Sequence, residues 1–199
     1  RKVNGVANKY YTWSPEGRLI GEANSSGVAL RKYTYATKSN IPDFFIDAAS
    51  AKFRIYSDQI GSPRVVVKVS NAAIQHKMQH DEFGRVTLDT VPGYLPFGFA
   101  GGFYDKDTGL VKFGARIYDP EIGRWLSKDP ILFDGGDTNL FGYVLNDPIN
   151  FVDPDGKNGY AIAFVSVAAG LAVWKLYKEL REDPELFNKI AEKIRNQIP

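Results

Sequence analysis

The segment Gly109–Gly156 has the sequence GLVKFGARIYDPEIGRWLSKDPILFDGGDTNLFGYVLNDPINFVDPDG and contains the dipeptide Asp-Pro four times. Proline fixes its own φ, lacks an N–H group and moves the preceding residue toward an extended backbone. Each Asp-Pro is therefore a rigid, non-helical corner that presents a carboxylate. Because two carboxylates held close together can carry out acid–base chemistry, the segment is predicted to be an irregular scaffold with catalytic potential. The aspartates of the four corners are Asp119, Asp129, Asp147 and Asp153.

Composition excludes several classes of function. The 199 residues suffice for one sizeable core, or for one domain with an appendage. The 25 basic and 23 acidic residues nearly balance, so no nucleic-acid partner is predicted. The absence of cysteine excludes a disulfide framework, a thiolate nucleophile and a cysteine-ligated zinc site.

The only two histidines, His76 and His80, are four residues apart. A metal site built on them would need a helix and a third ligand, whereas the surrounding residues predict a strand. No metal and no cofactor are therefore expected. The chain begins Arg-Lys-Val-Asn without a signal-peptide pattern, which suggests a fragment or a processed piece of a longer protein.

Short apolar segments alternate with polar turns from residue 8 to about residue 95. The recurring unit is an aromatic residue or histidine, a polar residue, a turn that ends in glycine, and then arginine with apolar β-formers. β-Hairpins at intervals of about twenty residues are typical of a repeat array. The clearest units are Tyr11–Arg18, Tyr56–Arg64 and His80–Arg85.

These units resemble the Tyr-Asp (YD) repeats of the Rhs family. The segment from Pro96 to Leu110 continues the resemblance, and Phe113–Ile131 and Asn139–Gly156 are similar to the Rhs-associated core domain. Known Rhs proteins carry polymorphic toxins: their repeats form a spiralling β-sheet that closes into a hollow shell around a C-terminal toxin. The resemblance covers residues 10–156 and depends on an ordered series of spacings.

The resemblance implies a mainly β fold in three parts. Residues 1–95 are expected to form YD-repeat β-hairpins, 96–156 the Rhs-associated core, and 157–199 a variable C-terminal extension. One curved antiparallel sheet, part of a β-spiral shell, is expected from residue 8 to about residue 112. The Asp-Pro-rich core follows it, and then a C-terminal α-helical hairpin.

A shell needs more repeats than this chain holds. We therefore expect a partner, either the remainder of an Rhs shell or a second copy of the chain in a homo-oligomer. The family further implies an immunity protein or a secretion-system component as partner. It also implies residence in the bacterial cytoplasm before export, followed by secretion.

Autoproteolysis in Rhs proteins is attributed to an aspartyl pair, whose counterparts here are Asp129 and Asp153. The cut would fall one residue beyond Gly156, between Lys157 and Asn158. Two close carboxylates cannot both ionise cheaply, so one would act as general base on a water molecule while the protonated one polarises the scissile carbonyl. Family members commonly carry an apolar residue where this chain has Lys157, and a charged side chain suits a dry cleavage site poorly.

Arg116 and Arg124 are predicted to anchor carboxylates and to hold the strands in register. The structural alternative is that every Asp-Pro unit only forms a turn, since aspartate accepts local backbone N–H bonds at such corners. In that case the chain is a non-catalytic encapsulation or interaction module.

The extension contains an apolar run of 15 residues, 160–174, followed by an amphipathic stretch. A membrane span needs about 20 residues. Asp183-Pro184 predicts the start of a second amphipathic helix. Three interpretations stay open: a helix buried inside the shell, a membrane helix over residues 160–177, and a remnant of a toxin domain.

Overall fold

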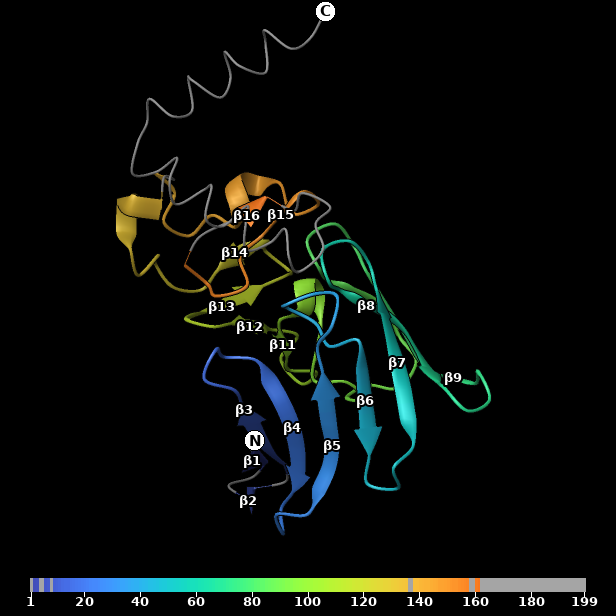
Figure 1. Cartoon of the computed structure of the whole chain (residues 1–199). Coiled ribbons are helices and arrows are strands. Elements are labelled where there is room, and N and C mark those ends of the chain that lie inside the picture. The colour runs from blue at the N-terminus through green and yellow to red at the C-terminus, as the bar shows by residue number, and fades with distance from the viewer. Residues whose placement is uncertain (1, 4–5, 8, 136–137, 158–159, 162–199) are drawn as a thin grey trace, which may run out of the picture. The chain divides into compact units, whose positions relative to one another are not determined.

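A computed structural model of the protein describes residues 2–3, 6–7, 9–135, 138–157 and 160–161. These residues form antiparallel β-sheets with three short 3-10 turns (Figure 1), so the predicted mainly β class is confirmed for this part of the chain. The predicted helical hairpin lies outside the described residues. The strands are β1 Lys2–Val3, β2 Val6–Ala7, β3 Lys9–Trp13, β4 Leu19–Asn24, β5 Ala29–Thr34, β6 Phe44–Asp47, β7 Lys52–Ser57, β8 Pro63–Lys68, β9 Ile74–His80, β10 Val86–Asp89, β11 Phe103–Tyr104, β12 Val111–Phe113, β13 Arg116–Asp119, β14 Arg124–Trp125, β15 Phe151–Val152 and β16 Tyr160–Ala161.

Strands β3 to β10 form one eight-stranded sheet in which every strand pairs with its neighbours in the chain. Figure 1 shows the strands β3 to β7 side by side in that order. The sheet ends at Asp89, whereas the sequence predicted a single sheet to about residue 112. Pro92 and Pro96 follow Asp89, and proline cannot donate to a strand ladder, so pairing stops and β11 to β14 form a separate four-stranded sheet.

The hairpin turns of the large sheet repeat one geometry. At Asp81, the backbone N–H bonds the Arg85 carbonyl at 2.9 Å, and the N–H of Gly84 bonds the Asp81 carbonyl at 3.1 Å. Oδ1 of Asp81 accepts the N–H of Arg85 at 2.8 Å, and Gly84 takes a φ of 90°, which suits glycine. This turn explains the repeated polar residue and glycine of the sequence pattern. Turns of the same kind begin at Ser14, Asn24, Asp47, Asp58 and Asp81.

One face of the large sheet is buried and strongly aromatic. Phe45 pairs with Tyr33 on one side and with Phe53 on the other, and its ring stacks on that of Phe53 at 4.7 Å. Phe97, from the segment after the sheet, meets Tyr33 edge-on at 5.0 Å. The chain that follows β10 therefore returns across this face and closes the first core.

A buried carboxylate lies within this aromatic face. Glu22 is 2% exposed, and its carboxylate accepts hydrogen bonds from the Lys9 ammonium at 2.8 Å and from the Tyr33 hydroxyl. The guanidinium of Arg31 lies 3.8 Å away. Because these partners come from the two strands that flank β4, the ionic network fixes the register of three adjacent strands.

The small sheet covers a second aromatic core. Trp125, Tyr118 and Tyr143 are each at most 2% exposed, and the rings of Tyr118 and Tyr143 lie 4.5 Å apart. The Tyr118 hydroxyl donates to the carbonyl of Phe83 at 2.8 Å, which ties this core to the last turn of the large sheet. The candidate site is built on the rim of this core.

Candidate functional site

Arg116 is the centre of the candidate site. It begins β13, in which alternate residues are buried, so Arg116 and Tyr118 point to the core while Ile117 is exposed. Arg116 is 4% exposed, and its guanidinium carbon lies 4.1 Å from the centre of the Trp125 ring. A cation buried against an aromatic face must be paired with anions.

The two predicted catalytic aspartates supply this pairing. Nη1 of Arg116 contacts Oδ2 of Asp129 at 2.9 Å, and Nη2 contacts Oδ2 of Asp153 at 2.8 Å. We call these three residues the Arg116 cluster. The structure thus brings Asp129 and Asp153 together on one guanidinium, each bound to a different nitrogen.

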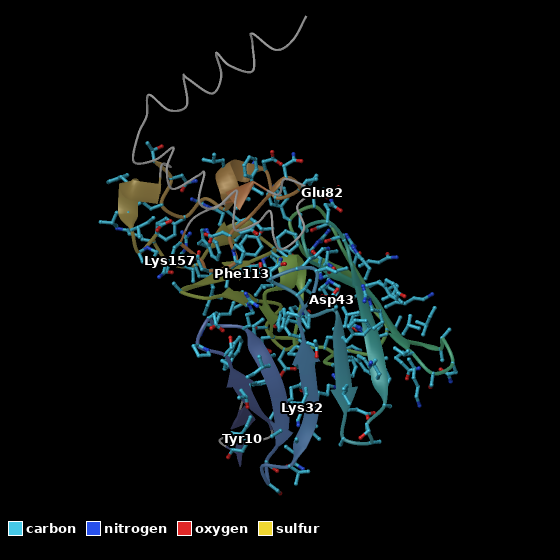
Figure 2. The ribbon with its side chains drawn as sticks, in the orientation of Figure 1. Tyr10, Lys32, Asp43, Glu82, Phe113 and Lys157 are labelled. Atoms are coloured by element: carbon cyan, nitrogen blue, oxygen red, sulfur yellow. The ribbon has the colours of Figure 1, made fainter. Side chains whose placement is uncertain are left out.

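The DPDG turn is fixed to the same guanidinium. Nε of Arg116 donates to the carbonyl of Gly156 at 2.6 Å, and Oδ1 of Asp153 accepts the N–H of Lys157 at 3.0 Å. The peptide bond between Gly156 and Lys157 is therefore held at its oxygen by Arg116 and at its nitrogen by Asp153. In Figure 2 the label Lys157 marks the end of the DPDG turn, and the label Phe113 marks the small sheet.

Glycine is required at position 156. Its φ is 67°, and a Cβ there would lie 2.3 Å from the carbonyl oxygen of Phe113. The preceding residue Asp155 accepts a backbone hydrogen bond from Ala115 at 2.9 Å. The turn thus lies directly against the hairpin that carries Arg116, which leaves no room for a side chain.

The remaining oxygens of the aspartates differ in their surroundings. Oδ1 of Asp129 accepts the N–H of Ile131 at 2.9 Å, which is the local turn bond that a purely structural Asp-Pro corner would make. The Asp129 side chain is 12% exposed and that of Asp153 is 2% exposed. Asp129 is therefore the aspartate nearer to solvent.

Burial raises the pKa of Asp153 to about 7, and a hydrogen bond with the Asp155 carboxyl group adds to the rise. The Lys157 N–H and the charge of Arg116 act in the opposite direction without cancelling it. Burial also raises the pKa of Tyr143, whose hydroxyl lies in the same region. Asp153 can therefore hold or release a proton near neutral pH.

Other predicted positions have structural partners. Arg124 lies on the exposed face of β14 and donates to the side-chain oxygen of Asn139 at 3.3 Å; within the described residues it has no carboxylate partner. Strand alternation turns Arg124 away from the core, and its role as a carboxylate anchor stays a prediction. Asp119 accepts the N–H of Glu121, and Asp147 binds the side chain of Asn150. Asn158, the far side of the predicted cut, lies outside the described residues.

Both histidines lie on β9, a strand, as predicted. His76 bonds Oδ1 of Asp89 at 2.8 Å. His80 lines a cavity of about 230 Å³, and its two ring nitrogens have no hydrogen-bond partner. In the part of the chain that the structure describes, no three His, Asp or Glu side chains are grouped so that they could hold a metal ion.

Two contacts of the Arg116 cluster were not predicted from the sequence. Trp125 supports the guanidinium, and Asp155 bonds Asp153. The buried position of Trp125 follows from the alternation of β14, which could have indicated it. The contact of Asp155 depends on the bend of the DPDG turn, for which the sequence holds no comparable signal.

Consecutive antiparallel hairpins with Asp–Gly turns, followed by an Asp-Pro core closed on an arginine, define a YD-repeat shell segment. The model of the Teneurin YD-shell family matches residues 6–149, and the chain belongs to this family. The resemblance to Rhs-type YD-repeat proteins is thereby confirmed.

Relatives include two bacterial proteins, a nuclease and a toxin, and an animal protein. The tRNA3(Ser)-specific nuclease WapA of Bacillus spizizenii is 27% identical over 89% of this chain and 8% of its own length. The double-stranded DNA deaminase toxin A of Burkholderia cenocepacia is 28% identical over 81% of this chain and 12% of its own. Teneurin-3 of Danio rerio is 33% identical over 70% of this chain and 6% of its own. The chain thus spans about a tenth of the length of these relatives.

The fold is also similar to that in a solved structure. The crystal structure of TcdB2-TccC3-TEV matches with a TM-score of 0.51 and 24% identity, over 78% of this chain and 9% of that one. This likeness concerns the fold alone. No helix among the described residues has the length and apolarity to cross a membrane.

Proposed function

We propose that the chain closes the end of a YD-repeat shell that encloses a polypeptide, and that the Arg116 cluster cuts the chain between Lys157 and Asn158. One observation carries the proposal: the two candidate aspartates share one buried guanidinium beside the DPDG turn. The kinship with toxins of which this chain spans a small part supports the shell.

In the proposed reaction, the more exposed Asp129 is the general base, since Arg116 stabilises its charge. Asp153 carries the proton, because its pKa of about 7 keeps about half of it protonated at neutral pH. Asp129 takes a proton from water as the water oxygen bonds the carbonyl carbon of Lys157. The bond from that carbon to the nitrogen of Asn158 then breaks, and Asp153 donates its proton to the departing amine.

Positioning supports this assignment. The peptide unit just before the proposed cut is held by Arg116 at its oxygen and by Asp153 at its nitrogen. A peptide with both polar groups bound loses most of its freedom, so the chain just before the proposed cut is fixed. Restriction of this kind is a large source of rate enhancement.

The mass of the purified intact protein tests the proposal. We expect two fragments that meet between Lys157 and Asn158, and their loss in Asp129→Asn and in Asp153→Asn. Asp119→Asn is the matched control, since Asp119 forms an Asp-Pro corner outside the cluster and should leave cleavage unchanged. A wild-type protein that keeps its full mass for days at pH 5 to 8 would exclude self-cleavage.

The second candidate is a non-catalytic encapsulation module. It is favoured by the turn bond from Ile131 to Asp129 and by the charged Lys157. In this case Asp129→Asn lowers the midpoint of urea unfolding, and both the wild type and the variant keep the mass of the uncut chain. Under self-cleavage, the same variant instead turns a cleaved protein into an uncut one.

Partners and location follow from the shell. The edges of the large sheet, β3 and β10, would pair with further repeats of a longer chain or with a second copy. An immunity protein, a secretion-system component and export from a bacterial cytoplasm belong to the same proposal. For the extension, membrane activity is the alternative to plain packing, and a synthetic 158–199 peptide that causes no liposome leakage at micromolar concentration would exclude it.

A further inference from the structure

We infer that Asp155 shares a proton with Asp153 and thereby sets the pH range in which the Arg116 cluster is active. The inference rests on the proposed self-cleavage and adds a positioning residue to it. Asp155 lies two residues after Asp153 in the DPDG turn and is exposed, whereas Asp153 is 1% exposed.

The geometry of one amide carries the argument. The N–H of Lys157 is accepted by Oδ1 of Asp153 at 3.0 Å and by Oδ1 of Asp155 at 3.2 Å. Two carboxylate oxygens that converge on one hydrogen lie close to each other. Two such groups cannot both remain ionised cheaply at the edge of a core, so a proton between them is favoured.

The charges around the turn lead to the same conclusion. Three carboxylates, those of Asp129, Asp153 and Asp155, gather about one guanidinium, that of Arg116. The hydroxyl of Tyr143 also faces this region and carries no charge, because burial raises its pKa. One proton on the Asp153–Asp155 pair brings the group closer to neutrality.

The two pairs of aspartates therefore have different roles. Asp129 and Asp153 bind different nitrogens of Arg116, so the guanidinium separates their bound oxygens. Asp153 and Asp155 share the Lys157 N–H through Oδ1 of each, whereas Arg116 contacts the other oxygen of Asp153, Oδ2. Asp155, exposed to water, supplies and removes the proton of its buried neighbour, while the Asp129 carboxylate contacts Nη1 of Arg116.

Asp155→Asn tests the inference, since asparagine keeps an oxygen for the Lys157 N–H but removes the charge. We expect the pH midpoint of cleavage to move about one pH unit lower, and the rate at pH 7 to fall about fivefold, because less Asp153 is protonated. Asp119→Asn is the control and should leave the pH profile unchanged. A carboxyl group that only supported the turn would change stability and leave the profile in place.

The titration of Asp153 is followed in parallel by NMR with ¹³C-labelled aspartate, in the wild type and in Asp155→Asn. If the wild type cleaves and both proteins have the same pH profile, the inference is overturned while self-cleavage stands. If the wild type does not cleave, the proposed function fails and the titration decides the proton sharing: a lower Asp153 midpoint in Asp155→Asn supports it, and equal midpoints overturn it.

Discussion

Acidification should destabilise the large sheet through His80. Its imidazole lies in a cavity lined also by Arg64 and Glu82, and neither ring nitrogen has a hydrogen-bond partner. Burial, together with the charge of Arg64, lowers the pKa of His80 from 6.5 to about 4. The folded protein therefore resists protonation of a group that the unfolded chain protonates readily.

The sign and the size of the effect follow from these pKa values. Between pH 6.5 and pH 4 the unfolded state binds more protons, so stability is present above pH 6.5 and is lost as the pH falls. At about 1.4 kcal/mol for each pH unit, the whole loss is about 3 kcal/mol. Most of it, about 2 kcal/mol, should appear between pH 7 and pH 4.5.

Urea unfolding at pH 7 and pH 4.5 measures this loss. Carboxylates also respond to pH, so the informative quantity is the difference between the wild type and a variant without the titrating ring. His80→Phe should lose about 2 kcal/mol less than the wild type over this interval. His80→Tyr should behave in the same way, which separates protonation from packing. An equal loss in all three proteins would refute the argument.

Three further predictions concern other buried groups. The raised pKa of Asp153 gives the wild type up to about 4 kcal/mol of stability below pH 3.8, and this stability is lost as the pH rises through about 7. Asp153→Asn should remove this pH-dependent contribution, which urea unfolding across that range measures. A variant whose stability depends on pH as steeply as that of the wild type would contradict the raised pKa. Glu22→Gln should lower the free energy of unfolding by about 2 kcal/mol, because it leaves the half-buried cations of Lys9 and Arg31 without their anion, and a change below about 0.5 kcal/mol would mean that water replaces the carboxylate. Gly156→Ala should lower the free energy of unfolding by about 3 kcal/mol and slow any cleavage. Gly109→Ala is the control: Gly109 has a φ of 74° and nothing within 4 Å of the new Cβ, so the loss should be about 1 kcal/mol. Equal losses would show that the contact with Phe113 yields easily.

The repeat pattern predicted the class of fold because its residues act locally. Asp58 and Asp81 each accept a hydrogen bond from the backbone N–H four residues later, so all the residues that form the turn are close together in the sequence. The strand β6, Phe44–Asp47, ends in a turn of the same kind, but Ser50 takes the place of the glycine, so the sequence unit is incomplete and the place of β6 between β5 and β7 depends on pairing. The end of the sheet at Asp89 likewise depends on where the chain turns back over the first core.

The candidate site was predictable in part for a similar reason. Motif spacing identified Asp129 and Asp153, but it could not show that Arg116 binds both of them while Arg124 faces solvent. Arg124 faces solvent because it alternates with the buried Trp125 on β14. Arg116 binds Asp153 because the fold brings together two residues that are 37 positions apart in the sequence. The role of Asp155 depends on the conformation of one turn.

The order of strands has a consequence for synthesis on the ribosome. Each strand from β4 to β10 pairs with the strand just before it, so the large sheet has low contact order and can grow one hairpin at a time as the chain emerges. The contact between Arg116 and Asp153 requires a residue that is translated later than the whole sheet. The Arg116 cluster is therefore among the last features to assemble, and its chemistry is delayed until the sheet before it has formed.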